Sequence, residues 1–223
     1  MRKLRLAVLL GALFVSASAP AENRLLSSIL APPENKWSIR VRAVYLNMAN
    51  KSDAVPALGV PENSIHVSSM FIPEVDISYF FTRHIAAELV LTYPQKHDLE
   101  ITASALGGFK AGTFSHLPPT LLLQYHFWPD SRFRPYLGGG VNYTFLFNEK
   151  LNVPNVTGLH LESGSLGGAL QLGFDVVLSK NIFLNFDVKK IYIDSNVKNN
   201  AGMKISHVAL DPIVAGIGLG WRF

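Results

Sequence analysis

The chain has 223 residues, of which 48% are hydrophobic and 16% charged, and it contains no cysteine. This length is that of one ordinary domain, and without cysteine no disulfide framework can hold the fold together. The formal net charge is +4, but Arg2, Lys3 and Arg5 supply three of these charges, and the +1 that remains without them does not favour nucleic-acid binding.

Residues 1–21 have the pattern of a secretory signal peptide. Basic residues come first, residues 6–15 form an apolar run, and Ala19-Pro20-Ala21 fits the small-x-small pattern at which such peptides are cleaved. The run is too short to span a bilayer. We therefore predict an exported protein whose signal peptide ends at Ala21, followed by an irregular periplasmic lead-in over residues 22–36.

Between residues 37 and 223, apolar residues recur at every second position. In the last stretch one parity carries Ile213, Ala215, Ile217, Leu219, Trp221 and Phe223, and the other carries Gly216, Gly218, Gly220 and Arg222. Because side chains alternate between the two faces of a strand, one face here is wholly apolar. No segment with the helical period could cover such a face, so lipid is its expected solvent. The same alternation predicts strands at 37–45, 71–81, 85–93, 120–127, 134–147, 165–178, 182–192 and 213–223.

These eight predicted strands are joined by short and long connections in alternation. Turns are predicted at 82–84, 129–131 and 179–181, and long loops at 55–64, 94–118, 148–160 and 195–202. Outer-membrane barrels have an even number of strands, short periplasmic turns and longer outer loops. The sequence therefore predicts an all-β protein, an eight-stranded antiparallel transmembrane β-barrel of the outer-membrane type over residues 37–223, located in the outer membrane of a Gram-negative cell.

The inward-facing side chains fall into two groups along the barrel axis. The group near the periplasmic end predicts a network of charges that plugs the barrel, because unpaired ions in a low dielectric are costly. It comprises Arg40, Arg42, Glu74, Asp76, Glu88, His126, Arg134, Asp175, Asp187 and Arg222. The group nearer the outer end predicts an apolar lining, and comprises Val44, Leu46, Met70, Ile72, Val90, Leu122, Leu146 and Ile191.

Three functions are compatible with this interior. An eight-stranded barrel holds its own side chains or one small ligand, so these groups either fill a scaffold or form an outward-open apolar funnel for small hydrophobic molecules. Since the floor of the funnel is blocked, a sideways exit between strands is the expected route. The alternative is a surface interaction protein, such as an adhesin, a receptor or a membrane-stabilising barrel.

Chemistry beyond passage or binding has little support in the sequence. A lipid-acting enzyme would need a serine, a histidine and an acid at the outer rim, and the spacing of Ser115, His116 and Asp98 does not force them together. We predict no catalytic residue, no cofactor and no metal. The seven histidines lack metal-ligand spacing and are expected to be solvated, namely His66, His84, His97, His116, His126, His160 and His207.

Several segments are similar to the OmpW family of small outer-membrane barrels. They are 79–82 with 84–89, 117–120 with 124–127, 134–138 with 140–144, 187–194, and Asp211-Pro212 with the ending Gly220-Trp221-Arg222-Phe223. The family has Pro-Phe after its third strand, from which Tyr93-Pro94-Gln95 departs. The resemblance implies an eight-stranded barrel, insertion by the barrel-assembly machinery through Phe223 with Trp221, and passage of small hydrophobic solutes. Outer-membrane lipids and lipopolysaccharide are the remaining expected partners, with Lys190 near the outer rim as a candidate for phosphate contact, unless a bulge turns it away.

Overall fold

The computed structural model describes residues 29–154 and 158–223. The predicted signal peptide, residues 1–21, and residues 22–28 of the predicted lead-in lie outside the described residues. Within the described part of the chain, none of the helices has the length and apolar character needed to cross a membrane.

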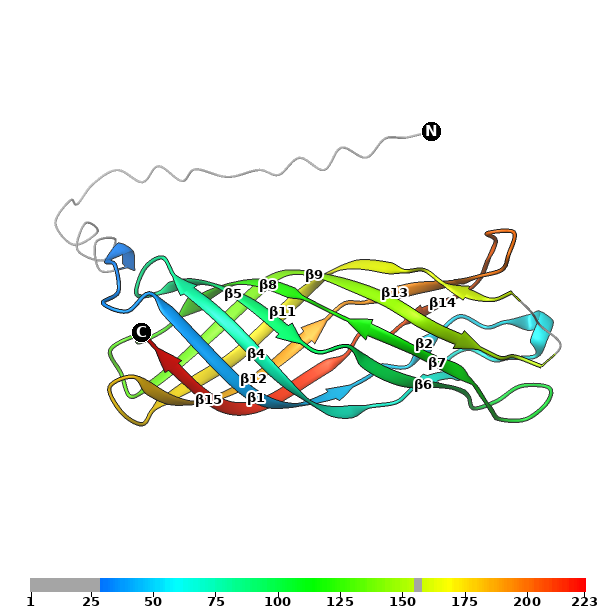
Figure 1. Cartoon of the computed structure of the whole chain (residues 1–223), viewed down its shortest axis with the longest axis horizontal. Coiled ribbons are helices and arrows are strands. Elements are labelled where there is room, and N and C mark those ends of the chain that lie inside the picture. The colour runs from blue at the N-terminus through cyan, green and yellow to red at the C-terminus, as the bar shows by residue number, and fades with distance from the viewer. Residues whose placement is uncertain (1–28, 155–157) are drawn as a thin grey trace, which may run out of the picture.

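Eight antiparallel strands close into a barrel, which Figure 1 shows from the side. The first strand β1 pairs with the last strand β15 from Ser38 opposite Arg222 to Asn47 opposite Ile213. Two backbone hydrogen bonds extend this seam, because Trp37 and Phe223 donate to each other's carbonyl oxygen at 2.9 and 2.8 Å. The predicted fold class is thus confirmed. Around the barrel the order is β1 (Trp37–Asn47), β4 (Met70–Phe80), β5 (Ile85–Thr92), β8 (Thr120–His126), β9 (Phe133–Leu151), β11 (Gly164–Val177), β12 (Ile182–Ile191) and β15 (Ile213–Arg222).

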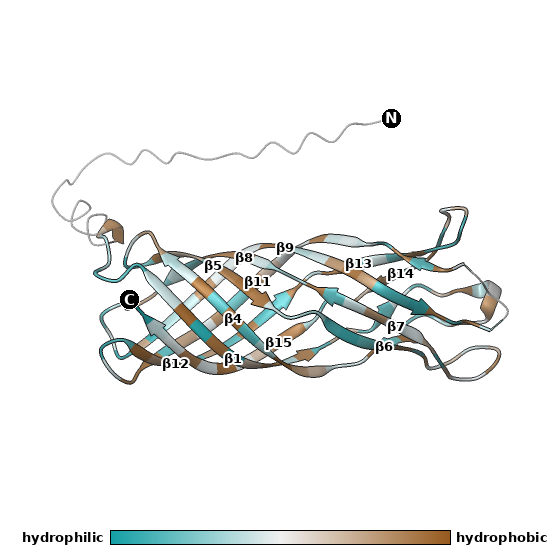
Figure 2. Ribbon diagram, viewed as in Figure 1, coloured by the Kyte–Doolittle hydropathy of each residue, from teal (hydrophilic) through white to brown (hydrophobic). Residues whose placement is uncertain are grey.

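The wall strands present their apolar side chains outward. In β1 the exposed and buried positions alternate without a break, and Val41 is 56% exposed while Arg42 beside it is buried. Figure 2 shows the corresponding teal and brown bands along this strand. The exposed hydrophobic side chains are those that the parity of the sequence assigned to lipid, and the polar ones lie inside the barrel.

The barrel continues beyond the predicted strands at the end opposite the C-terminus (Figure 1). The prediction of a loop over 94–118 was wrong, because this segment forms two paired strands. In these strands the apolar residues face inward and charged residues such as Lys96 and Glu100 face outward, which is the reverse of the wall pattern and fits a water-exposed surface. We call the following elements the outer extension: β2 (Lys51–Ser52), η1 (Pro56–Leu58), β3 (Ile65–Val67), β6 (Gln95–Ile101), β7 (Phe109–Leu117), β10 (His160–Leu161), β13 (Asp194–Lys198), β14 (Lys204–Ala209) and the end of β9.

Strand pairing is interrupted where the third and fourth wall strands enter the outer extension. The β5–β8 ladder ends with Val90 opposite Thr120, and the β6–β7 ladder begins with Gln95 opposite His116. The residues between these ladders include Pro94, Pro118 and Pro119. Proline has no backbone N–H to donate, so each proline removes one possible ladder hydrogen bond, and three of them lie together here. The wall therefore lacks ladder hydrogen bonds between residues 91–94 and residues 117–119, and we call this gap the interrupted seam.

Candidate functional site

Two arginines of β1 organise the half of the interior that lies nearer the C-terminus. Arg42 is buried, and its guanidinium pairs with the carboxylates of Asp76, Glu74 at 3.0 Å and Asp187 at 2.7 Å. Arg40 is also buried and pairs with Glu88 and with Asp175, the latter at 3.2 Å. The sheet register supports this arrangement, since Asp76 and Glu74 lie directly opposite the two arginines across the β1–β4 seam.

A third buried cation, Lys189 on β12, was not predicted. Its ammonium group donates to Glu74 at 2.8 Å and to Asp187 at 3.1 Å. Gln171 joins the same network by donating to Glu88 at 2.9 Å and to Asp187 at 2.6 Å. Gln171 lies on the same face of β11 as Asp175, and Lys189 lies on the same face of β12 as Asp187. The alternation of the sequence could therefore have predicted that both residues belong to the network.

Three predicted members of the plug lie outside these ion pairs. His126 is buried, and its Nε2 donates a hydrogen bond to Gln124 Oε1 at 3.0 Å. The Arg222 guanidinium lies 3.7 Å from the centre of the Phe80 ring, and Arg134 donates to the Ser131 carbonyl oxygen at 2.9 Å. These arginines are half-buried and lie at the end of the barrel that carries the C-terminus.

The predicted apolar lining gathers outward of the charge network. Seven of its eight residues are buried and Met70 is half-buried, and all of them pack in one apolar cluster with residues of the outer extension. The seven buried residues are Val44, Leu46, Ile72, Val90, Leu122, Leu146 and Ile191.

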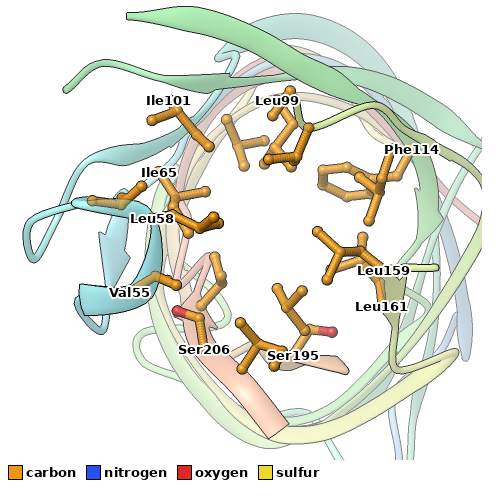
Figure 3. Close-up of a pocket in the computed structure, with 18 of the residues that line it drawn as sticks. Val55, Leu58, Ile65, Leu99, Ile101, Phe114, Leu159, Leu161, Ser195 and Ser206 are labelled. Carbon is orange, nitrogen blue, oxygen red and sulfur yellow. The ribbon is translucent and has the colours of Figure 1, made fainter. Parts of the chain in front are cut away.

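An apolar cavity of about 60 Å³ lies farther out, inside the outer extension. Figure 3 shows side chains from η1, β3, β6, β7 and β10 pointing toward this common space. Of the predicted lining, only Leu146 contributes, and most of the remaining residues come from the predicted loops 55–64, 94–118, 148–160 and 195–202. The labelled residues are Val55, Leu58, Ile65, Leu99, Ile101, Phe114, Leu159 and Leu161, with Ser195 and Ser206 as the polar members.

Three polar side chains, Gln95, His97 and His116, form a buried cluster beside the interrupted seam. Their side chains point from β6 and β7 toward the inside of the barrel, and each is fully buried. The two imidazole rings stack with their centres 4.8 Å apart. The expectation that these histidines are solvated was therefore wrong, because the segment that carries them is paired sheet and not a loop.

The residues considered for a catalytic site do not converge. Asp98 faces outward and pairs with Lys110 at 2.7 Å, whereas His116 faces the interior. Within residues 29–154 and 158–223, no three histidine, aspartate or glutamate side chains are placed to hold a metal ion.

Comparison with known proteins places this architecture among outer-membrane barrels. Residues 35–223 match the model of the OmpW family. The outer-membrane protein y4mB of Sinorhizobium fredii is 37% identical over 234 residues, which cover 100% of this chain and 97% of that protein. The dibenzothiophene metabolism operon protein PahQ of Pseudomonas aeruginosa is 29% identical and covers 85% of this chain and 90% of its own. The crystal structure of OprG from Pseudomonas aeruginosa superposes with a TM-score of 0.73 at 28% identity, over 87% of this chain and 99% of that one.

Proposed function

Because the chain belongs to the OmpW family and forms an outer-membrane β-barrel, we propose that it gives small hydrophobic molecules a passage into the outer membrane. One observation carries this proposal: the apolar side chains that line the cavity in the outer extension pack in the same apolar cluster as the predicted lining inside the barrel. Cavities with such linings bind apolar molecules by removing their surface from water. The name of the relative PahQ, which refers to dibenzothiophene metabolism, agrees with a solute of this class.

The charge network supports a passage that is blocked toward the periplasm. Arg40, Arg42 and Lys189 are at most 2% exposed, and every one of them is paired with buried carboxylates. An apolar molecule that moved straight through would have to separate these ions in a low dielectric, which is costly. The network therefore acts as a floor beneath the apolar cluster.

The interrupted seam between β5 and β8 supports a sideways exit. At this level the wall lacks ladder hydrogen bonds around Tyr93-Pro94 and Pro118-Pro119, so fewer backbone bonds must break when the strands separate. An apolar solute that leaves the barrel through the interrupted seam enters the hydrocarbon core of the membrane. This transfer is favourable because it keeps the apolar surface of the solute away from water.

A carboxylate in the apolar cluster tests the passage. We expect Leu122→Asp combined with Ile72→Asp to lower the rate at which cells take up the apolar dye N-phenyl-1-naphthylamine at least tenfold, because a buried charge makes the route unfavourable for an apolar molecule. The rise in dye fluorescence on mixing with cells that make the protein gives the rate. Lys110→Asp, at an exposed position of the outer extension, is the control and should take up dye at the wild-type rate. Equal rates in the two variants would rule the passage out.

A second candidate function is binding of a partner at the cell surface. It is favoured by the outer extension, whose paired strands carry charged residues such as Lys96, Glu100 and Lys110 outside the membrane. A surface interaction protein would keep its partner when Leu122 and Ile72 are replaced, and would lose it when the exposed charges of the outer extension are reversed.

The outward face of the barrel wall implies two membrane partners, namely lipids and lipopolysaccharide. The exposed apolar side chains contact outer-membrane lipids, and Lys190 is the candidate for contact with lipopolysaccharide phosphates. Its ammonium group donates to the Asp211 carbonyl oxygen and lies 5.7 Å from the centre of the Tyr192 ring, so it is held at the aromatic outer rim.

The terminal residue tests the assembly proposal. We expect deletion of Phe223 to lower the amount of folded barrel in outer membranes severalfold, because Phe223 with Trp221 is the proposed signal for the barrel-assembly machinery. Its loss also removes the two hydrogen bonds to Trp37 that extend the closing seam. Heat-modifiable gel mobility of isolated membranes measures the folded fraction. Phe223→Tyr, which keeps an aromatic end and both backbone bonds, should assemble like the wild type. A deletion variant that assembles equally well would refute the signal.

A further inference from the structure

The cluster of Gln95, His97 and His116 contains buried hydrogen-bonding atoms that have no partner. The atoms are Gln95 Oε1, His97 Nε2 and both ring nitrogens of His116. Buried polar atoms without partners raise the free energy of a fold, so such a group calls for an explanation. We infer that this cluster binds the hydroxyl group of a solute, so that the solutes include hydroxylated molecules such as phenols and long-chain alcohols. The inference rests on the proposed passage and names a substrate class for it.

The contacts within the cluster determine which atoms donate and which accept. The Gln95 amide nitrogen donates to Thr92 Oγ1 at 2.8 Å and to the Tyr93 carbonyl oxygen, so its free atom Oε1 is an acceptor. His97 Nδ1 lies 2.7 Å from the Ser68 carbonyl oxygen. A carbonyl oxygen only accepts, so Nδ1 carries the proton and the free Nε2 is an acceptor in the neutral ring.

Both histidines are neutral near pH 7. Burial, with a smaller contribution from the neighbouring His97, lowers the pKa of His116 to about 3. Burial also lowers the pKa of His97, against the Ser68 carbonyl oxygen and Asp98, which raise it. Both residues belong to the outer extension. A neutral His116 therefore offers one N–H donor and one nitrogen acceptor, and the whole cluster offers several acceptors and one donor.

A hydroxyl group fits this set of atoms better than other oxygen groups. It donates to one of the free acceptors and accepts from the His116 N–H at the same time. A ketone or ether can only accept, and a hydrocarbon can do neither. Discrimination by a site that hydrogen-bonds a hydroxyl is strong, because the unhydroxylated analogue leaves the polar atoms of the site unpaired.

The cluster lies between the apolar cavity and the interrupted seam, on the route proposed for the solute. Phe114 lines the apolar cavity, and its ring centre is 5.7 Å from that of His97 and 6.4 Å from that of His116. One side chain thus separates the cluster from the cavity. The other side of the cluster reaches the interrupted seam, since Gln95 bonds to the Tyr93 carbonyl oxygen there.

Titration of the purified full chain in detergent micelles with 1-naphthol and with naphthalene tests the inference. With nitrogen-15 in the histidine rings, we expect 1-naphthol to shift the nitrogen resonances of His97 and His116, and naphthalene to leave them unchanged. 1-Naphthol should also bind about fivefold to tenfold more tightly than naphthalene, relative to their partition into empty micelles, which is the effect of about one hydrogen bond.

Substitutions of His116 separate hydrogen bonding from shape. His116→Leu should remove the preference for 1-naphthol and leave naphthalene binding unchanged, whereas His116→Gln, which keeps a donor and an acceptor, should retain the preference. Phe114→Leu changes the shape of the same surface without changing its polarity and should also retain it. Heat-modifiable gel mobility shows that each variant is folded.

Each outcome of this titration bears on one proposal. Equal binding of the two probes, or a preference that survives His116→Leu, would overturn the hydroxyl site and leave the apolar passage intact. Equal dye uptake by the Leu122→Asp, Ile72→Asp variant and by the Lys110→Asp control, with 1-naphthol still bound at the histidines, would instead overturn the passage.

Discussion

Replacing Arg42 with methionine is expected to lower the free energy of unfolding of the barrel by about 3–5 kcal/mol. Arg42 pairs with Glu74 at 3.0 Å and Asp187 at 2.7 Å, and also with Asp76. Methionine fills a similar volume but leaves these buried carboxylates without their main cation. The loss is therefore the cost of uncompensated charge in a low dielectric, and not the loss of one hydrogen bond. Urea unfolding in lipid vesicles, followed by tryptophan fluorescence, measures it.

An exposed ion pair provides the matched control for Arg42. Lys110 lies 2.7 Å from Asp98 in the outer extension, where both side chains are about half exposed. Water screens this pair, so Lys110→Met should change the free energy of unfolding by about 0–1 kcal/mol. Adding Asp76→Asn to Arg42→Met should recover part of the loss, because one unpaired charge is removed. Similar stabilities of Arg42→Met and Lys110→Met would contradict the view of the network as a set of mutually dependent buried ions.

Substituting alanine for Gly140 is expected to lower the free energy of unfolding by about 3 kcal/mol. Gly140 on β9 lies opposite Leu122 on β8, and a Cβ atom at this position would come within 1.9 Å of the Leu121 carbonyl oxygen. The clash is with backbone, which no side-chain rotation can relieve, so the two wall strands must move apart. The same urea unfolding experiment measures the effect.

The adjacent glycine is a direct comparison for Gly140. A Cβ atom on Gly139 would meet its nearest neighbour, the Ala169 carbonyl oxygen, at 3.8 Å, which is an ordinary contact distance. Gly139→Ala should therefore be neutral within about 0.5 kcal/mol, because nothing has to move. If Gly139→Ala destabilised the barrel as much as Gly140→Ala, loss of glycine itself, and not close strand approach, would be the cause.

The wall of the barrel could be predicted from the sequence because lipid imposes a simple rule on it. The outward positions of the wall strands within the hydrocarbon, such as Ile39 and Leu219, are apolar, and this leaves a period of two that no loop would keep. The rule ends at the membrane surface. In β6 the outward residues are Lys96, Asp98 and Glu100, and their alternation with Leu99 and Ile101 is that of any half-buried strand. The whole segment 94–118 is long, polar and contains glycine, which predicts a loop.

The interior could be predicted only where parity was sufficient. The positions of Arg40, Arg42 and their carboxylates follow from the strand in which each lies, but the pairing of Lys189 with Glu74 depends on how side chains from opposite walls meet across the barrel. Gln95, His97 and His116 were missed for a different reason. Their burial depends on the pairing of β6 with β7, and that pairing could not be expected once the segment was assigned to a loop.

The outer extension changes where capture from water would take place. Seven residues of β6, at about 3.3 Å each and with a tilt of about 40°, raise the mouth of the cavity by about 18 Å above the aromatic rim. In the proposed setting, the sugar chains of lipopolysaccharide would occupy this layer, which is unfavourable for apolar compounds. A rigid collar of paired strands would carry such a compound through the carbohydrate without letting it touch the sugars, so the speed of entry would depend little on how dense that coat is.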